Sequence, residues 1–171
     1  MPDIADIIIP RLVKPIGLPV TVHLHVLADA SGTAYGATAY LVVFTENDVN
    51  SHLILAKSKV APLKPMTIPR LELSAALLAA KLCHKIHSTL NFIIHQSWLW
   101  SDSTIVLSWI RRQPREFKPF VSSRLAEINE LTHQHVWLHV PSKENPADCI
   151  TSGTSPSKSS QCSLWWHVQD S

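Results

Sequence analysis

Hydrophobic and polar residues alternate along the first part of the chain, and the period then changes to that of a helix. The stretch VTVHLHVLA, from Val20 to Ala28, alternates and is rich in β-branched residues, which is typical of a strand. Two more such runs follow, each after a polar turn, so three successive antiparallel strands are expected. Apolar residues then recur at helical spacing, and one face of this segment carries Leu71, Ala75, Leu78, Leu82 and Ile86. Pro69 suits the first turn of this helix, and its cap is expected at Thr67 or Ile68.

The rest of the chain adds a short apolar strand, two amphipathic helices, a fifth strand and a loop that runs into a short helix or turn. The predicted strands cover residues 20–28, 35–44, 52–60, 97–102 and 135–140, and the predicted helices cover residues 70–90, 103–113 and 118–134. This order predicts an α/β domain with one mixed sheet and with helices packed on its faces.

Length and composition suit one globular domain. The chain has 171 residues, of which 46% are hydrophobic and 16% charged, so a packed core is expected and global disorder is excluded. We expect a linker over residues 1–19, the domain over residues 20–153, and a Ser-rich tail over residues 154–171 that ends in an apolar LWWH segment.

Three features bear on the compartment. No apolar run approaches the roughly 20 residues that cross a bilayer, and the acidic N-terminus lacks the pattern of a signal peptide. The cysteines are odd in number and form no C-x-x-C pair, which favours a reducing compartment. We therefore expect a soluble intracellular protein, cytoplasmic or nuclear, with no membrane partner. The formal charge of +2 is only weak evidence for a nucleic-acid partner.

Four carboxylates are predicted to lie at the ends of elements. Asp29 ends the first strand, Glu72 lies in the first turn of the long helix, Asp102 ends the fourth strand and Asp148 follows the fifth. Ligand sites in α/β sheets form outside strand ends, so these side chains could share one pocket. Four anions in one pocket raise one another's pKa unless cations neutralise them. Two Mg²⁺ ions would do so, because Mg²⁺ prefers carboxylate oxygen and a pair of metals can hold an attacking water and a leaving oxygen across a phosphate.

Each carboxylate also has a simpler interpretation. Asp29 could begin an Asx turn, Glu72 could complement the helix dipole, Asp102 could cap the next helix, and Asp148 could be an ordinary surface residue. Taken singly, the simpler interpretation is favoured for all of them except Asp29. Their order and local contexts, taken together, favour a shared site.

Four motifs carry a resemblance to a known family. ADASGTAYGA, RLELSAALLAA, WSDSTIVLSWI and HVPSKENPAD occur in the order found in type 1 ribonucleases H, over about residues 20–153. The longer stretch LAKSKVAPLKPMTIPRLELSAALLAAKL, together with WSDSTIVLSWI and the terminal LWWH, more closely resembles the ribonuclease H domain of BEL/Pao retrotransposon polyproteins. The resemblance implies a ribonuclease H-like fold with a five-stranded sheet, and an endonuclease that cuts the RNA strand of an RNA–DNA hybrid.

The resemblance also implies roles for residues and partners. Asp29, Glu72, Asp102 and Asp148 match the four metal-binding carboxylates of the family, which hold two Mg²⁺ ions, with Mn²⁺ as a substitute. In that chemistry a metal-bound water attacks the phosphorus and leaves a 5′-phosphate and a 3′-hydroxyl. The expected partners are the hybrid and the reverse transcriptase and integrase domains of a parent polyprotein, of which we expect this chain to be a fragment.

Two departures from the family pattern bear on activity. The loop PSKEN has no counterpart of the mobile histidine that many members carry before the last Asp, and His139 is not assigned that role. Ser152 stands where arginine is usual in BEL/Pao domains. Two functions therefore stay open: an active ribonuclease H, or a catalytically inactive remnant that keeps the fold and at most binds nucleic acid. The presence of all four carboxylates favours the first.

Basic, hydroxyl and amide side chains indicate where a duplex would bind. One basic group follows the second helix and another lies beside the helix that carries Glu72, and a groove between them could hold a duplex backbone through phosphate contacts. These groups are Arg111, Arg112, Arg115, Lys118 and Arg124, and Lys57, Lys59, Lys64 and Arg70. The residues that could recognise the 2′-hydroxyls of RNA are Ser31, Ser103, Thr104 and Asn145. A solvated basic face is the simpler interpretation.

The ten histidines raise the question of a zinc site. The candidates are His23 and His25 on one strand face, His133 and His135 at a helix end, and Cys83 and His84 near His87. None of them follows the paired spacing of structural zinc sites, so the sequence alone gives zinc little support.

Overall fold

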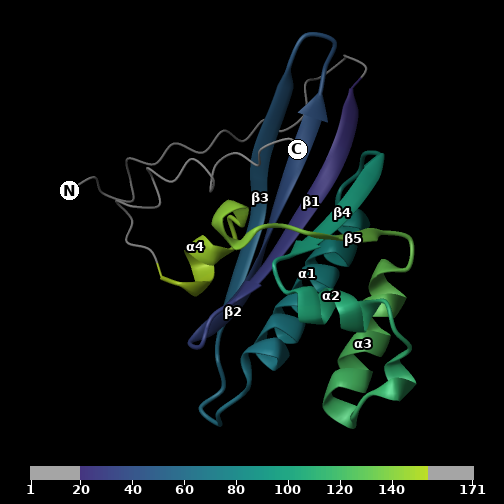
Figure 1. Cartoon of the computed structure of the whole chain (residues 1–171). Coiled ribbons are helices and arrows are strands. Elements are labelled where there is room, and N and C mark those ends of the chain that lie inside the picture. The colour runs from purple at the N-terminus through teal and green to yellow at the C-terminus, as the bar shows by residue number, and fades with distance from the viewer. Residues whose placement is uncertain (1–19, 154–171) are drawn as a thin grey trace, which may run out of the picture.

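The first predicted strand forms the centre of a five-stranded sheet (Figure 1). The computed structural model describes residues 20–153, so the predicted linker and tail lie outside the described residues. The strands are β1 (Thr21–Ala30), β2 (Ala34–Phe44), β3 (Val49–Val60), β4 (Gln96–Ser101) and β5 (Val136–His139). Their order across the sheet is β3-β2-β1-β4-β5.

The sheet is mixed, as predicted. β1 pairs antiparallel with β2, and β2 pairs antiparallel with β3, which gives the expected meander. On its other side β1 pairs parallel with β4, and β4 pairs parallel with β5. Parallel neighbours run in the same direction, so the chain leaves β1 and β4 at the same edge of the sheet.

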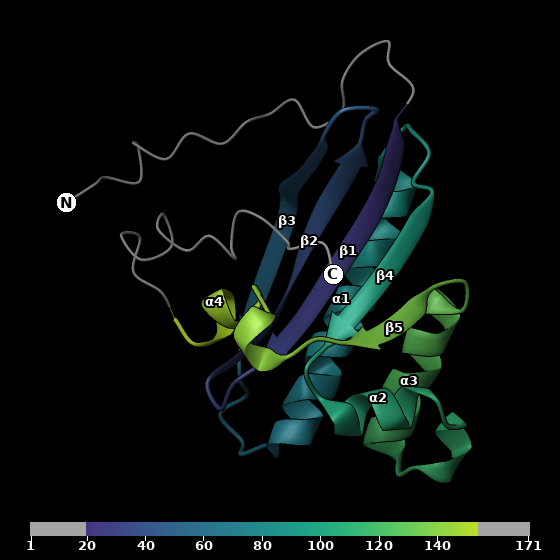
Figure 2. The same ribbon diagram turned by 45° about the horizontal axis from the view of Figure 1, so that its top comes forward.

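Helices lie on both faces of the sheet (Figures 1 and 2). They are α1 (Ile68–Thr89), α2 (Thr104–Ile110), α3 (Pro119–Thr132) and α4 (Asp148–Thr151), with short 3-10 helices η2 (Pro114–Glu116) and η3 (Ser142–Glu144). The long helix α1 packs against β1 and β2, and α3 packs against α1. The short α4 lies on the opposite face, over the ends of β1 and β2 (Figure 2).

Alternate residues of β1 supply the main core, which lies between the sheet and α1. Val22, Leu24, Val26 and Ala28 point to this side and are at most 2% exposed. The predicted apolar face of α1 contributes Ala75, Leu78, Leu82 and Ile86 to the same cluster. A second cluster packs the other side of α1, including Leu73, Ala76 and Ala80, against α2 and α3. Because α1 is buried on two sides, its sequence is rich in Leu and Ala almost all the way round.

Several predicted boundaries differ from the structure by two or three residues: β1 continues to Ala30, β3 begins at Val49 and α3 ends at Thr132. α1 begins at Ile68, with Thr67 at the cap position and Pro69 in the first turn, as predicted. α2 ends at Ile110 instead of residue 113, and η2 takes up the chain at Pro114. None of the helices among residues 20–153 combines the length and the apolar character that crossing a bilayer requires.

Candidate active site

The parallel pairing of β1 with β4 brings two of the predicted carboxylates together. Ala28 is paired with Ser101, so Asp29 and Asp102 are the next residues on adjacent strands, at one edge of the sheet. Because the two carboxylates are close, the negative charge of Asp102 raises the pKa of Asp29. The sequence predicted Asp29 and Asp102 near the ends of two strands, although β1 continues past Asp29 to Ala30. It could not give the strand order that makes the two residues neighbours.

Asp29 is the most perturbed of the four carboxylates. Its side chain points away from α1, toward α4, where the hydroxyl of Thr151 donates a hydrogen bond to Asp29 Oδ2. Only 8% of the residue is exposed. Burial raises its pKa from 3.8 to about 6, the charges of Asp102 and Asp148 add to that effect, and the bond from Thr151 opposes it. A carboxylate at the end of an apolar strand is therefore kept here at a measurable electrostatic cost.

Glu72 approaches the same edge from α1. Ser103 Oγ donates a 2.6 Å hydrogen bond to Glu72 Oε2, which joins α1 to the turn that follows β4. Burial raises the pKa of Glu72, and the charge of Asp102 adds to it, while the bond from Ser103 lowers it. The prediction that Glu72 lies in the first turn of the helix is wrong, because α1 begins at Ile68 and has no acidic residue in that turn. The helix dipole therefore does not explain Glu72.

Asp102 and Asp148 complete the group. Ser142 Oγ in η3 donates a 2.7 Å hydrogen bond to Asp102 Oδ2. The cap of α2 is Ser103, whose side chain accepts a hydrogen bond from the backbone N–H of Val106, so the interpretation of Asp102 as that cap is wrong. Asp148 is the first residue of α4 and is exposed. The four predicted carboxylates thus converge on one edge, with Asp29 buried below Asp148.

The donors at this edge are suited to a hard cation. No Lys or Arg side chain among residues 20–153 forms an ion pair with any of the four carboxylates. All of the candidate ligand atoms are oxygens, which are the ligands of Mg²⁺ and Mn²⁺. Within the described part of the chain, no three of these carboxylates bring one oxygen each within 4.8 Å of one another. A cation would therefore draw the side chains inward, in competition with the hydroxyls that now hold three of them.

Buried polar contacts hold α4 over Asp29. Asn145 is 2% exposed, and its side-chain amide donates to the carbonyl of Ala28 and accepts from the backbone N–H of Ala147. Ser31 Oγ donates a 2.8 Å hydrogen bond to the carbonyl of Thr151. Both residues were predicted to contact RNA. In this structure their side chains instead fasten the loop and helix that carry Asp148 to the end of β1.

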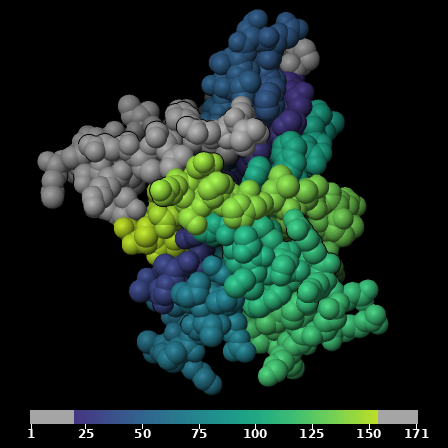
Figure 3. All heavy atoms as spheres, viewed as in Figure 1, coloured from purple at the N-terminus to yellow at the C-terminus, as the bar shows by residue number. Residues whose placement is uncertain are grey.

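Gly36 permits the close approach of α4. It is paired with Asp29 in the β1–β2 ladder. A Cβ atom at Gly36 would lie 2.5 Å from Ile150 Cδ1 and 3.0 Å from the carbonyl oxygen of Lys57. The missing side chain therefore creates the space in which Ile150 seats α4 against the sheet. In the space-filling view the segment from β5 to α4 runs as a continuous band across the molecule (Figure 3).

The two predicted basic groups meet at one aromatic ring. The guanidinium carbon of Arg70, from α1, lies 5.0 Å from the centre of the Phe120 ring, and that of Arg124 lies 3.6 Å from it. Arg70 is exposed, and its guanidinium lies against Phe120 of α3. Thr104 is also exposed, at the start of α2.

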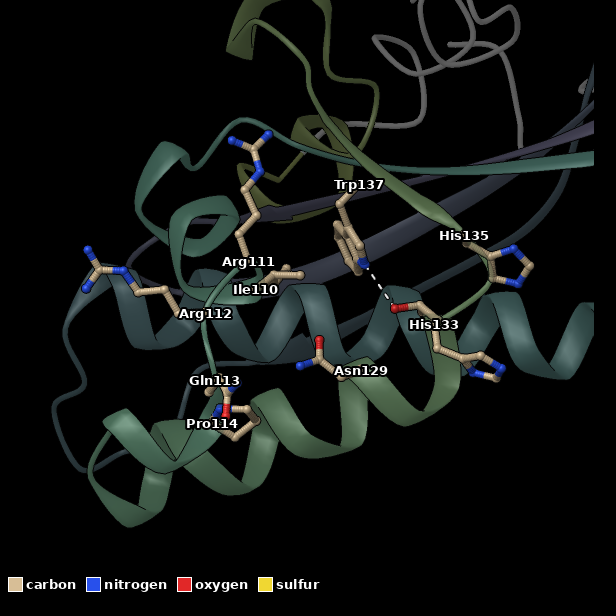
Figure 4. Close-up of a pocket in the computed structure, with 10 residues that line it drawn as sticks. Ile110, Arg111, Arg112, Gln113, Pro114, Asn129, His133, His135 and Trp137 are labelled. Atoms are coloured by element: carbon tan, nitrogen blue, oxygen red, sulfur yellow. Dashed lines mark hydrogen bonds between the residues drawn. The ribbon is translucent and has the colours of Figure 1, made fainter.

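Arg111 and Arg112 line a pocket between α2, α3 and β5 (Figure 4). The pocket has a volume of about 500 Å³, and Gln113, Asn129 and His133 also line it. Arg115 lies just beyond, in η2, and all three arginines are exposed. This arrangement leaves their guanidinium groups available for phosphate contacts.

Sequence reasoning missed the hydroxyl and glycine positions that shape the site. Thr151 and Ser142 hold Asp29 and Asp102, and Gly36 admits α4. Serine and threonine are common in loops, so their types carried no signal of these contacts. The pairing of Gly36 with Asp29 was in principle available from the predicted antiparallel hairpin.

Comparisons with known proteins show the family and the fold of this chain. A family model described as "Pao retrotransposon-like RNaseH-like domain" matches residues 2–103. No curated protein matches the chain. The N-terminal RNase H domain of rv2228c from Mycobacterium tuberculosis, solved as a fusion with maltose-binding protein, has a TM-score of 0.51 and 17% identity, over 78% of this chain and 92% of that one. It shares the fold, which confirms the predicted ribonuclease H-like class.

Two other solved structures are similar at lower TM-scores. LC11-RNase H1 in complex with an RNA/DNA hybrid has a TM-score of 0.44 and 15% identity, over 73% of this chain and 88% of that one. The foamy viral protease–reverse transcriptase in complex with dsDNA has a TM-score of 0.46 and 15% identity, over 84% of this chain and 99% of that one.

Proposed function

Because this chain belongs to the family of Pao retrotransposon-like RNaseH-like domains, we propose that it cleaves the RNA strand of RNA–DNA hybrids with the help of divalent cations. The observation that carries the proposal is the state of Asp29. It is buried beside Asp102 and Asp148, its pKa is raised to about 6, and no basic side chain among the described residues forms an ion pair with it. A buried like-charge cluster with no basic partner is a frequent sign of a functional site.

The four carboxylates would hold the cations, each from a different element. Asp29 would hold them from β1, Glu72 from α1, Asp102 from the end of β4 and Asp148 from α4. When bound, two Mg²⁺ ions, or Mn²⁺ in their place, would supply a Lewis acid at the scissile phosphate and lower the pKa of a water molecule. The chain itself supplies the rigid support, because Asn145 and Ser31 fix α4 relative to β1.

The duplex would lie over the carboxylates and against the basic side chains that begin at Arg70. Phosphate contacts from exposed arginines position a duplex without reading its bases. Thr104, which is exposed near Asp102, is available to a 2′-hydroxyl, whereas Asn145 is buried beneath the site. We therefore assign substrate contact to Thr104 and the arginines, and a positioning role to Asn145 and Ser31.

Cleavage of an end-labelled hybrid by the full chain tests the proposal. We expect products with a 3′-hydroxyl in the presence of Mg²⁺ or Mn²⁺, no products in EDTA, and no products from Asp29→Asn. Glu46→Gln is the matched control, because Glu46 is exposed in the β2–β3 turn and its replacement removes the same charge away from the site. Binding of the hybrid without cleavage by the wild-type chain would instead identify an inactive remnant that keeps the fold.

Family membership also supports a proposal about context. The retrotransposon description fits a domain that acts on the hybrid made during reverse transcription. We therefore propose that reverse transcriptase and integrase domains of a parent polyprotein are its partners, and that it acts inside the cell.

A further inference from the structure

A second cluster of metal-binding side chains lies on α1, away from the carboxylates. Cys83 and His87 are four positions apart on this helix, so both project from one face, and His135 reaches the same point from the position just before β5. One ligand atom from each of the three residues lies within 4.8 Å of the other two. Among the residues that the structure describes, no other group of three His, Cys, Asp or Glu side chains converges so closely.

The surroundings leave the cluster partly open to solvent. Cys83 is fully buried, His135 is half-buried and His87 is exposed. His87 Nε2 lies 2.8 Å from the hydroxyl of Ser97 on β4. His135 is also one of the residues at the pocket between α2, α3 and β5 (Figure 4).

We propose that Cys83, His87 and His135 form a binding site for a thiophilic transition-metal ion, with Zn²⁺ as the expected occupant. One thiolate and two imidazoles are the donor set that Zn²⁺ accepts, and Mg²⁺ does not choose sulfur or nitrogen ligands. Three protein ligands leave the fourth tetrahedral position to water, which can enter beside the exposed His87. The site therefore differs in chemistry from the all-oxygen carboxylate edge.

The three ligand atoms lie near one another, at distances longer than those of a closed metal site. Zinc binds nitrogen at about 2.0–2.1 Å and sulfur at about 2.3 Å, so the three ligand atoms must move somewhat closer together. The rings of His87 and His135 are stacked, with centroids 5.1 Å apart and an interplanar angle of 15°. Both rings would turn in order to aim a nitrogen at one ion.

The cluster brings together α1 and the segment that enters β5. β5 is a four-residue strand at the edge of the sheet, and its pairing with β4 is its only strand pairing among the described residues. An ion bound by Cys83, His87 and His135 would link the β5 edge of the sheet to α1. Glu72 is about 16 Å away from Cys83 along the axis of α1, at about 1.5 Å per residue, so the two metal sites are separate.

Cobalt titration of the full chain tests the proposal. We expect Co²⁺ to give a thiolate-to-cobalt charge-transfer absorption band, and Zn²⁺ to abolish that band by displacement. Cys83→Ser should abolish the band. His87→Ala should weaken Zn²⁺ binding by at least about tenfold, because loss of a residue that merely supports a metal ligand already weakens metal binding by about that factor. His84→Ala is the matched control, because His84 is an exposed neighbour on α1 that is not a member of the cluster.

A second measurement removes the ambiguity of a misfolded variant. His87 is exposed, so His87→Ala should keep the wild-type circular dichroism spectrum and unfold cooperatively without metal. Zn²⁺ should raise the unfolding temperature of the wild type and of His84→Ala but not of His87→Ala. The proposal is overturned if wild-type protein gives no charge-transfer band, if Cys83→Ser keeps the band, or if His87→Ala binds Zn²⁺ as tightly as His84→Ala.

Discussion

Replacement of Asp29 by Asn should make the metal-free protein more stable while it abolishes cleavage. The pKa of Asp29 is raised from its ordinary value of 3.8 to about 6, chiefly because the side chain is buried. The unfolded chain therefore loses this proton at lower pH than the folded chain does. Stability of the wild type should fall as the pH rises through the window from about 4 to 6, and the full cost is present above it.

The size of the effect follows from this difference in pKa. At about 1.36 kcal/mol for each pH unit, the range from 3.8 to about 6 corresponds to an upper limit of about 3 kcal/mol. Partial access of solvent to the carboxylate screens the charge, so we expect about 1–2 kcal/mol. Asn keeps the shape and can still accept the hydrogen bond from Thr151. At roughly 2–4 °C for each kcal/mol, the unfolding temperature should rise by several degrees.

Unfolding in EDTA at several pH values measures the effect. Asp29→Asn should match the wild type near pH 4 and exceed it near pH 7, whereas Glu46→Gln, which changes an exposed carboxylate, should show no such pH-dependent gain. Mg²⁺ should then stabilise the wild type more than the Asn variant, since an ion bound only to the folded state raises stability. A variant that unfolds more readily at pH 7, or that cuts hybrid at the wild-type rate, would refute the reasoning about Asp29.

Three further predictions concern the cation, the seat of α4 and the basic face. Hybrid cleavage should require Mg²⁺ or Mn²⁺ and should not be rescued by Zn²⁺, because the carboxylate site offers only oxygen; cleavage that survives EDTA would contradict this. Gly36→Ala should displace Ile150, lower stability by about 1–3 kcal/mol and impair cleavage, whereas Gly32→Ala, where a Cβ meets nothing within 4 Å, should do neither. Joint replacement of the exposed arginines by Ala should weaken hybrid binding by a similar factor for every sequence. The slope of log affinity against log salt should become shallower by roughly 0.9 for each phosphate that is no longer neutralised on a B-form duplex. If both the slope and the affinity are unchanged, these arginines are only a solvated face. The arginines to replace are Arg111, Arg112 and Arg115.

The elements of this fold were largely predictable because their patterns are local. The alternation in β1 and the apolar face of α1 depend on residues a few positions apart, and both segments formed where predicted, within a few residues at each end. The cap of α1 at Thr67 was among the predicted positions, but Glu72 was assigned to the first turn and lies just beyond it. The candidate carboxylates also came from the sequence, through their order along the chain and their motif contexts.

What the sequence did not determine is which distant residues meet. Periodicity does not encode that β4 pairs with β1, and that pairing alone makes Asp102 a neighbour of Asp29. The hydroxyl of Thr151 on Asp29, and the approach of His135 to Cys83, likewise depend on how whole elements pack. Local preferences fix strands and helices, but contacts between them are selected by burial of the shared core. The residue types therefore determined the chemistry available to both sites, and only the tertiary structure decided how each site is assembled.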